Sequence, residues 1–174
     1  MARALIGIGS NIEPAKNVRA ALRSLARQAH LVGFSTVYCT EPLGPPGQPV
    51  YFNCVAEIET ELTPAQVKHT MLRPIEDELW RKRTQDKYAP RTIDLDLIAY
   101  GELAMDEGGI RLPDPDILHR PFLAIPLAEL APDLLLAGHG LRVGDVAAVM
   151  ARDGMEPLQD YSWLLNDEVS RRRG

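Results

Sequence analysis

Hydrophobic and polar positions along the chain predict an alternation of strands and helices. Four runs have the pattern of strands, at residues 4–8, 31–38, 51–58 and 94–100. Apolar positions at helical spacing predict helices over 14–26, 63–79, 121–130 and 143–151. No internal repeat or low-complexity segment interrupts this order. The chain is therefore expected to build one fold that contains both strands and helices.

The second of these helices carries start and distortion signals. Thr63 is a suitable N-cap, because a proline follows it at the first helical position and Gln66 stands three residues on. Pro74 lies inside the helix, where it lacks a backbone N–H and crowds the carbonyl four residues earlier. We therefore expect a kink near Pro74.

Length, charge and cysteine content narrow the class of protein. A chain of 174 residues with 45% hydrophobic content suits one domain with a sizeable core. A formal net charge of −5 argues against general nucleic-acid binding, so small-molecule partners are expected. No signal-peptide pattern and no run of about 18 apolar residues is present, which predicts no membrane association. Cys39 and Cys54 lie in apolar runs without metal-ligand spacing, which favours buried free thiols and a cytoplasmic location.

The strand-like run 91–100 carries two carboxylates. One side of it presents the apolar residues Ile93, Leu95, Leu97 and Ala99. Asp94 and Asp96 then share the other side, with Cα atoms about 6.5 Å apart in an extended chain. Two such carboxylates can hold Mg²⁺ together with substrate phosphates. The alternative is a half-buried strand that merely shows charges to solvent.

A basic segment directly precedes this strand. Residues 81–91 contain five cations in a polar connection that could close over a polyphosphate. A solvated charge run is the simpler reading of the same residues. Between the second and third strands, residues 41–49 are rich in proline and glycine, which predicts a stiff loop suited to shaping a pocket.

The segment 90–96, Pro-Arg-Thr-Ile-Asp-Leu-Asp, resembles the signature of hydroxymethyldihydropterin pyrophosphokinases. These enzymes transfer diphosphate from ATP to a pterin alcohol in the folate pathway. Further segments resemble that family in order: 6–11 its first strand and G-S-N turn, 42–53 its pterin loop and next strand, and 112–122 with 126–132 its C-terminal signature.

The resemblance implies a single α+β domain, ferredoxin-like, with an antiparallel sheet backed by helices. We assign residues 1–153 to this pyrophosphokinase-like domain and 154–174 to a C-terminal extension. The extension is expected to be a helix packed on the body with a frayed end.

The resemblance also implies an activity and a site. The expected reaction gives AMP and the pterin diphosphate, with ATP as co-substrate and two Mg²⁺ ions held by Asp94 and Asp96. The implied catalytic residues are Arg81, Arg91, Asp94 and Asp96. The implied pterin contacts are Thr40, Leu43, Tyr51, Asn53 and Phe122. The implied ATP contacts are Arg73, Glu76, Arg83, Leu97, Asp114 and Arg120.

The chain departs from the family pattern at several positions. Tyr88-Ala89 stands where the family usually has Trp-Gly, and about one extra residue before Ile75 would fit a π-type bulge near Pro74. Asp114 replaces a histidine that contacts phosphate, although a carboxylate repels phosphate unless it is protonated or paired with a cation. Asp114 could pair with an arginine, bind Mg²⁺, or cap the local turn, and its place between two prolines favours the cap.

Two other functions remain open at this stage. A non-catalytic pterin or nucleotide sensor on the same fold would account for Asp114 and the altered second helix. Nucleic-acid binding through residues 81–91 is weakened by the net acidity and the sparse aromatic residues.

Overall fold

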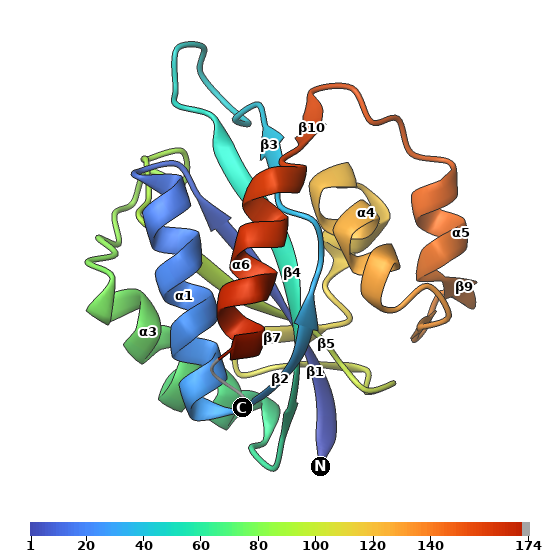
Figure 1. The fold of residues 1–174 in the computed structure, drawn as a ribbon. Helices are drawn as coiled ribbons and strands as arrows, with labels where there is room; N and C mark the ends of the chain where they lie inside the picture. The colour runs from blue at the N-terminus through green and yellow to red at the C-terminus, as the bar shows by residue number, and fades with distance from the viewer. Residues whose placement is uncertain (172–174) are drawn as a thin grey trace.

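A six-stranded antiparallel sheet forms the centre of the protein in a computed structural model, which describes residues 1–171 (Figure 1). The sheet runs in the order β10 (Met155–Pro157), β3 (Tyr38–Thr40), β4 (Tyr51–Thr60), β1 (Ala2–Ser10) and β5 (Asp94–Tyr100). The sixth strand, β2 (His30–Phe34), pairs with the other end of β4. Helices cover the sheet, so the expected α+β, ferredoxin-like, single-domain fold is confirmed.

The two faces of the sheet are packed differently. One face is covered by α1 (Pro14–Gln28), by α3 (Arg73–Glu78) with the turns before it, and by α6 (Gln159–Arg171). Ile6 and Ile8 of β1 point into this larger core. The other face packs against α4 (Pro121–Leu130) and α5 (Val143–Ala148). Leu5 contributes to that core, whereas Gly7 and Gly9 leave the continuing face without side chains.

The second helix is interrupted where the sequence predicts. It consists of α2 (Pro64–Gln66), the π-helical turn η1 (Val67–Leu72) and α3. Thr63 and Gln66 form the expected capping box. The Arg73 N–H bonds to the Lys68 carbonyl, five residues back, immediately before Pro74. The widened turn accommodates a proline that has no N–H to give.

Two details of the expected strands are wrong. The single strand expected over 31–38 is two strands, β2 and β3, separated by residues 35–37. Ala99 does not share a face with Leu97, because the register with β1 shifts so that Leu5 faces Ala99 and Ile6 faces Leu97. Ile98 is the extra residue, and Ile98 and Ala99 are both buried in the core on the α4 side.

The helix expected over 143–151 is shorter and ends at Ala148. Several further elements were not anticipated. They are the hairpin β6 (Met105–Glu107) and β7 (Ile110–Leu112), the 3₁₀ helix η2 (Pro115–Leu118), the hairpin β8 (Leu135–Leu136) and β9 (Leu141–Arg142), and β10. These strands are two or three residues long, which is too short for an alternating pattern to identify.

The C-terminal segment joins the body through β10 and α6. β10 forms the edge of the sheet beside β3, and α6 lies next to α1 (Figure 1). Leu165 and Val169 of α6 are buried in the larger core. The frayed end falls on residues 172–174, which lie outside the described residues. Across residues 1–171, none of the helices is both long and apolar enough to cross a membrane.

Candidate active site

A cavity of about 580 Å³ opens over the sheet face that carries Gly7 and Gly9. Its floor runs across β3, β4, β1 and β5, and the 41–50 and 81–91 loops contribute to its walls. The register places Gly9 between Asn53 and Asp94, and Gly7 beside Asp96. A Cβ atom at Gly9 would lie only 2.9 Å from Asn53 Oδ1, so a larger residue would press on this side chain. The absence of side chains on β1 therefore opens the floor between β4 and β5.

All five residues expected to contact the pterin line this cavity. They are Thr40, Leu43, Tyr51, Asn53 and Phe122. The Asn53 amide nitrogen donates to Thr40 Oγ1 at 2.7 Å, so the orientation of the amide is set by its neighbour on β3. Tyr51 and Phe122 border the same space from β4 and from the first turn of α4.

The β5 side of the cavity is charged, and Asp94 is its most constrained residue. One Asp94 oxygen accepts from Arg81 Nη1 and the other from Arg91 Nη1, both at 2.8 Å. Arg81 also donates to the Ile93 carbonyl at 2.6 Å. Two guanidinium groups therefore already neutralise the carboxylate that the sequence assigns to a metal.

Asp96 has a different environment from Asp94. It faces the cavity, and its pKa is raised to about 7. The protein around Asp96 removes part of the water from its charged carboxylate although the residue remains exposed, and Asp94, Asp114 and Glu76 repel it as well. A divalent cation would relieve this repulsion, because it supplies the positive charge that the group lacks.

The donor set fits Mg²⁺ that arrives with phosphate. Within residues 1–171 no cluster of three or more His, Cys, Asp or Glu side chains could hold a metal ion. Asp94 and Asp96 supply two carboxylates on one strand face, and Mg²⁺ commonly binds through one or two carboxylates while phosphates and water complete its shell. The pair therefore suits an ion shared with substrate rather than a structural metal.

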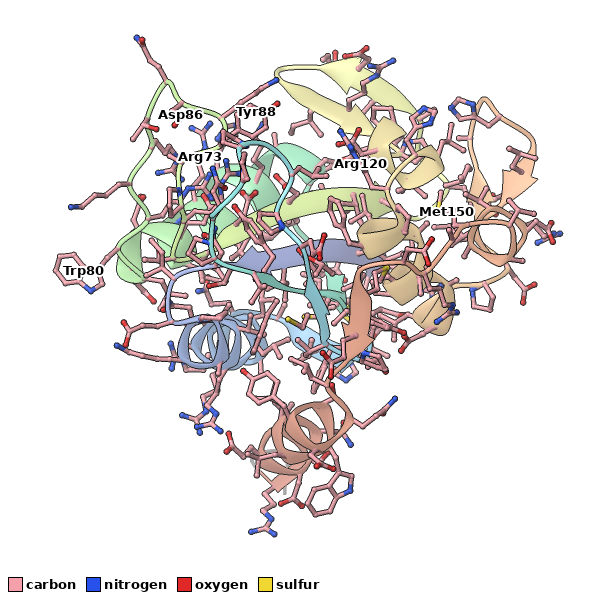
Figure 2. The ribbon with its side chains drawn as sticks, turned by 90° about the horizontal axis from the view of Figure 1, so that it is seen from above. Arg73, Trp80, Asp86, Tyr88, Arg120 and Met150 are labelled. Atoms are coloured by element: carbon pink, nitrogen blue, oxygen red, sulfur yellow. The ribbon has the colours of Figure 1, made fainter. Side chains whose placement is uncertain are left out.

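Arg91 and Arg120 also line the cavity, whereas Leu97 and four charged residues expected in the site do not. Those four are Arg73, Glu76, Arg81 and Arg83, of which Arg81 lies behind Asp94. Arg73 is exposed at the start of α3 (Figure 2).

Glu76 acts as a buried anchor. Its Oε1 accepts from the Leu95 N–H at 2.9 Å, and its Oε2 accepts from Arg83 Nη2 at 2.5 Å. Burial raises the pKa of Glu76, and Asp94 raises it further, while the hydrogen bond from Leu95 and the two arginines oppose the shift. Arg83 also donates to Asp77 at 2.9 Å. Glu76 thus ties α3 to β5 and to the start of the 81–91 loop.

A second cavity of about 230 Å³ adjoins the first. It shares Asp96 and Asp114 with the larger cavity, and Leu97 lines it rather than the larger one. Lys68 forms part of its wall and donates to the Gly109 carbonyl at 2.6 Å, which joins η1 to the β6–β7 hairpin.

Asp114 caps a turn, as its place between two prolines favours. Its Oδ1 accepts from the Asp116 N–H at 2.9 Å at the start of η2. Burial raises the pKa of Asp114 and Asp116 adds to the rise, whereas the hydrogen bond from Asp116 and the charge of Arg111 lower it. Asp114 does not complete a three-ligand metal cluster with Asp94 and Asp96 in the described chain.

Several cavity residues were missed by sequence reasoning. Gly7, Gly9 and Tyr88 line the cavity. Tyr88 lies so close to Gly44 that a Cβ on this glycine would come within 2.5 Å of the ring, so the two loops touch. Asn11 accepts from the Arg91 N–H at 2.8 Å and donates its own N–H to the Arg91 carbonyl. The G-S-N turn was a signal for Asn11, but a loop-to-loop contact leaves no local pattern.

Comparisons with known proteins agree with this geometry. A family model described as 7,8-dihydro-6-hydroxymethylpterin-pyrophosphokinase (HPPK) matches residues 5–132. The 2-amino-4-hydroxy-6-hydroxymethyldihydropteridine pyrophosphokinase of Haemophilus influenzae is 40% identical over 139 residues, which is 78% of this chain and 86% of the relative. The protein of the same name from Pseudomonas aeruginosa is 36% identical over 159 residues, or 90% and 96% of the two chains.

A solved structure supports the fold. The Plasmodium falciparum HPPK-DHPS triple mutant with pteroate superposes with a TM-score of 0.67 at 8% identity. The match covers 90% of this chain and 46% of that chain, so this chain corresponds to less than half of the larger protein. At this identity the likeness concerns the fold alone.

Proposed function

The chain belongs to the 7,8-dihydro-6-hydroxymethylpterin-pyrophosphokinase family, and we propose that its larger cavity holds the pterin over β3 and β4 and the triphosphate of ATP over β5. The protein transfers diphosphate from ATP to 6-hydroxymethyl-7,8-dihydropterin, giving AMP and the pterin diphosphate in folate biosynthesis. ATP is the co-substrate and Mg²⁺ the associated metal. One observation carries the assignment of subsites. A slot formed by the Asn53 amide and the Tyr51 and Phe122 rings lines the same cavity as the carboxylates of Asp94 and Asp96.

The pterin subsite is proposed on β3, β4 and α4. The ring would lie between Tyr51 and Phe122, since aromatic side chains offer flat surfaces for a flat ligand. Asn53 would hydrogen-bond to the ring edge, and its bond to Thr40 keeps the amide in one orientation. Leu43 would cover the ring from the 41–50 loop.

The metal subsite is proposed at Asp94 and Asp96, which would hold two Mg²⁺ ions. Bound Mg²⁺ would neutralise phosphate charge and orient the triphosphate for attack. Metal binding at Asp94 would release Arg81 and Arg91 from this carboxylate, and their guanidinium groups could then bond to phosphate oxygens.

The nucleotide is proposed to extend from β5 toward the second cavity. Arg120 and Arg91 line the route along the larger cavity, and Leu97 gives the second cavity an apolar wall. The roles expected for Arg73 and Arg83 require their side chains to turn toward the phosphates, which an inward movement of the 81–91 loop would allow for Arg83. Glu76 and Asp114 act by position, through Leu95 and through η2.

The chemistry asks the protein for charge neutralisation and alignment. The hydroxymethyl oxygen forms a bond to the β-phosphorus and its proton passes to water. The bond from that phosphorus to the oxygen bridging to the α-phosphorus breaks, so this bridging oxygen leaves with AMP. Only β1 separates the proposed pterin subsite on β3 and β4 from the proposed triphosphate subsite on β5, so the attacking group would lie beside the triphosphate without a domain movement. Arg81 and Arg91 would stabilise the negative charge that develops on the leaving AMP.

A non-catalytic sensor is not favoured on this fold. Binding alone would need no pair of repelling carboxylates beside Arg91, yet Asp96 is held in that unfavourable position.

The proposal is tested by incubating the purified protein with ATP, Mg²⁺ and the pterin alcohol and separating the products. We expect AMP and the pterin diphosphate in equal amounts, and neither when a chelator removes Mg²⁺. ADP as the nucleotide product, or no metal dependence, would refute the assignment.

A further inference from the structure

The gap between β2 and β3 is fixed from three directions. The Ser35 N–H bonds to the Val55 carbonyl of β4 at 2.8 Å. The Thr36 N–H bonds to a carboxylate oxygen of Glu129 on α4 at 2.8 Å. The Val37 N–H bonds to Ser162 Oγ on α6 at 2.8 Å. The chain therefore enters β3 between two helices that lie on opposite faces of the sheet.

The contact between α6 and Val37 is reciprocal. Ser162 Oγ accepts from the Val37 N–H and donates to the Leu158 carbonyl at 2.7 Å. The Leu158 N–H in turn donates to the Val37 carbonyl at 2.8 Å. Both backbone polar groups of Val37 are thus bound by the start of α6, and the Val37 side chain is fully buried. This leaves the residue before β3 little freedom to shift.

Val37 leads directly to the proposed pterin contacts. It precedes β3, whose last residue, Thr40, accepts from the Asn53 amide. On β4, Phe52 stands between Tyr51 and Asn53 and points to the opposite face, where its ring centroid lies 5.7 Å from that of Tyr161 on α6. The C-terminal segment therefore supports the strands of the slot from behind.

We propose that α6 is a positioning element for pterin recognition and that Ser162 is its principal residue. The inference rests on the pterin subsite proposed above. Ser162 fixes Val37, Val37 sets the place of β3, and β3 presents Thr40 to the Asn53 amide. The segment lies beyond residues 5–132, which match the family model.

The test compares variants of the full-length protein. Ser162→Ala removes the hydroxyl, while Ser162→Thr keeps it. Trp163→Ala changes the neighbouring residue on the exposed side of α6 and is the matched control. Calorimetry measures the pterin Kd in the presence of a non-hydrolysable Mg-ATP analogue, and the Kd of the analogue alone.

We expect Ser162→Ala to raise the pterin Kd roughly three- to tenfold, the loss of one hydrogen bond, with the analogue Kd unchanged. Ser162→Thr should restore the wild-type value and Trp163→Ala should not change it. A second variant, Tyr161→Leu, removes the ring that contacts Phe52 and should also weaken pterin binding selectively, which keeps the inference testable if Ser162→Ala does not fold.

Equal weakening of both ligands, or wild-type pterin affinity in the folded Ser162→Ala and Tyr161→Leu variants, would overturn the inference. A wild-type protein that forms no pterin diphosphate would overturn the proposed function instead. The two failures are therefore distinguishable, because one is measured in the variants and the other in the unaltered chain.

Discussion

At the scale of single residues, Asp94 and Asp96 divide the electrostatic roles of the site. Asp94 forms ion pairs with two arginines, Arg81 and Arg91, at 2.8 Å each. The charged form of Asp96 is unfavourable in the folded protein, since its pKa is raised to about 7 by desolvation and by neighbouring carboxylates. Such a group destabilises the ligand-free fold in exchange for metal affinity.

This difference predicts an effect of pH on stability. In the folded protein the pKa of Asp96 is about 7, whereas an aspartate in the unfolded chain loses its proton near the ordinary pKa of 3.8. Stability from this group is therefore lost as the pH rises between these values. At pH 8, with a chelator present, we expect the free energy of unfolding of Asp96→Asn to exceed that of wild type. The difference should be only about 1 kcal/mol, because solvent reaches the Asp96 side chain.

Denaturant unfolding at pH 4 and pH 8 measures this prediction. The advantage of Asp96→Asn over wild type should shrink toward zero at pH 4. A constant difference between the two proteins across that range would show that the Asp96 carboxylate does not titrate as described.

Sequence reasoning identified the charged residues at this scale because the P-R-T-I-D-L-D run places them close together along the chain. It could not show that Arg83 pairs with Glu76 and Asp77 outside the cavity while Arg91 lines the cavity. Both are arginines in one basic segment, and only the folded loop decides which acidic partner each one meets.

At the scale of elements, the 41–50 and 81–91 loops act as neighbours. Gly44 has a φ of 113°, and the Tyr88 ring occupies the place that a side chain on Gly44 would take. Gly47 also has a positive φ, 87°, but a Cβ there would meet nothing within 4 Å. Comparing substitutions at Gly44 and Gly47 therefore distinguishes the effect of backbone strain from that of a clash between the loops.

The variants Gly44→Ala and Gly47→Ala test this difference between the two glycines. Both variants should lose about 1 kcal/mol of stability from the left-handed backbone. Only Gly44→Ala should also lower kcat/KM for the pterin, by roughly tenfold, because it displaces Tyr88 from the cavity wall. Steady-state kinetics would measure the difference, and equal kinetics in the two variants would mean that the contact between the loops has no role in catalysis.

The helices and long strands were predictable because burial on one face produces a regular apolar pattern. The break at residues 35–37 was not, since it depends on Glu129 and Ser162, which are distant in sequence. The shift of Ala99 likewise depends on how β5 pairs with β1, which a single strand cannot reveal.

At the scale of the whole molecule, the two proposed subsites share one cavity and one pair of loops. Arg91 and Tyr88 lie on the same loop, so phosphates that drew Arg91 away from Asp94 would also move the cavity wall beside the proposed pterin subsite. We therefore expect pterin affinity to rise at least about fivefold with a non-hydrolysable Mg-ATP analogue. Calorimetry with and without the analogue measures this coupling, and equal affinities would exclude it.

The overall architecture was predictable from ordered motifs that extend over most of the chain, but the role of its C-terminal part was not. β10 is three residues long and contains a proline, so it has no pattern of its own. It becomes a strand only because β3 offers an unpaired edge, and that edge exists only in the assembled sheet.

The rate of diphosphate transfer by Asp96→Ala tests the central claim most directly, with Asp153→Ala, an exposed aspartate outside the cavity, as its control. The account predicts that turnover of Asp96→Ala falls roughly a hundredfold or more, because the metal loses a ligand, while the variant remains folded. Asp153→Ala should turn over at the wild-type rate. Wild-type turnover by Asp96→Ala at limiting Mg²⁺ would contradict the metal site and, with it, the proposed arrangement of the cavity.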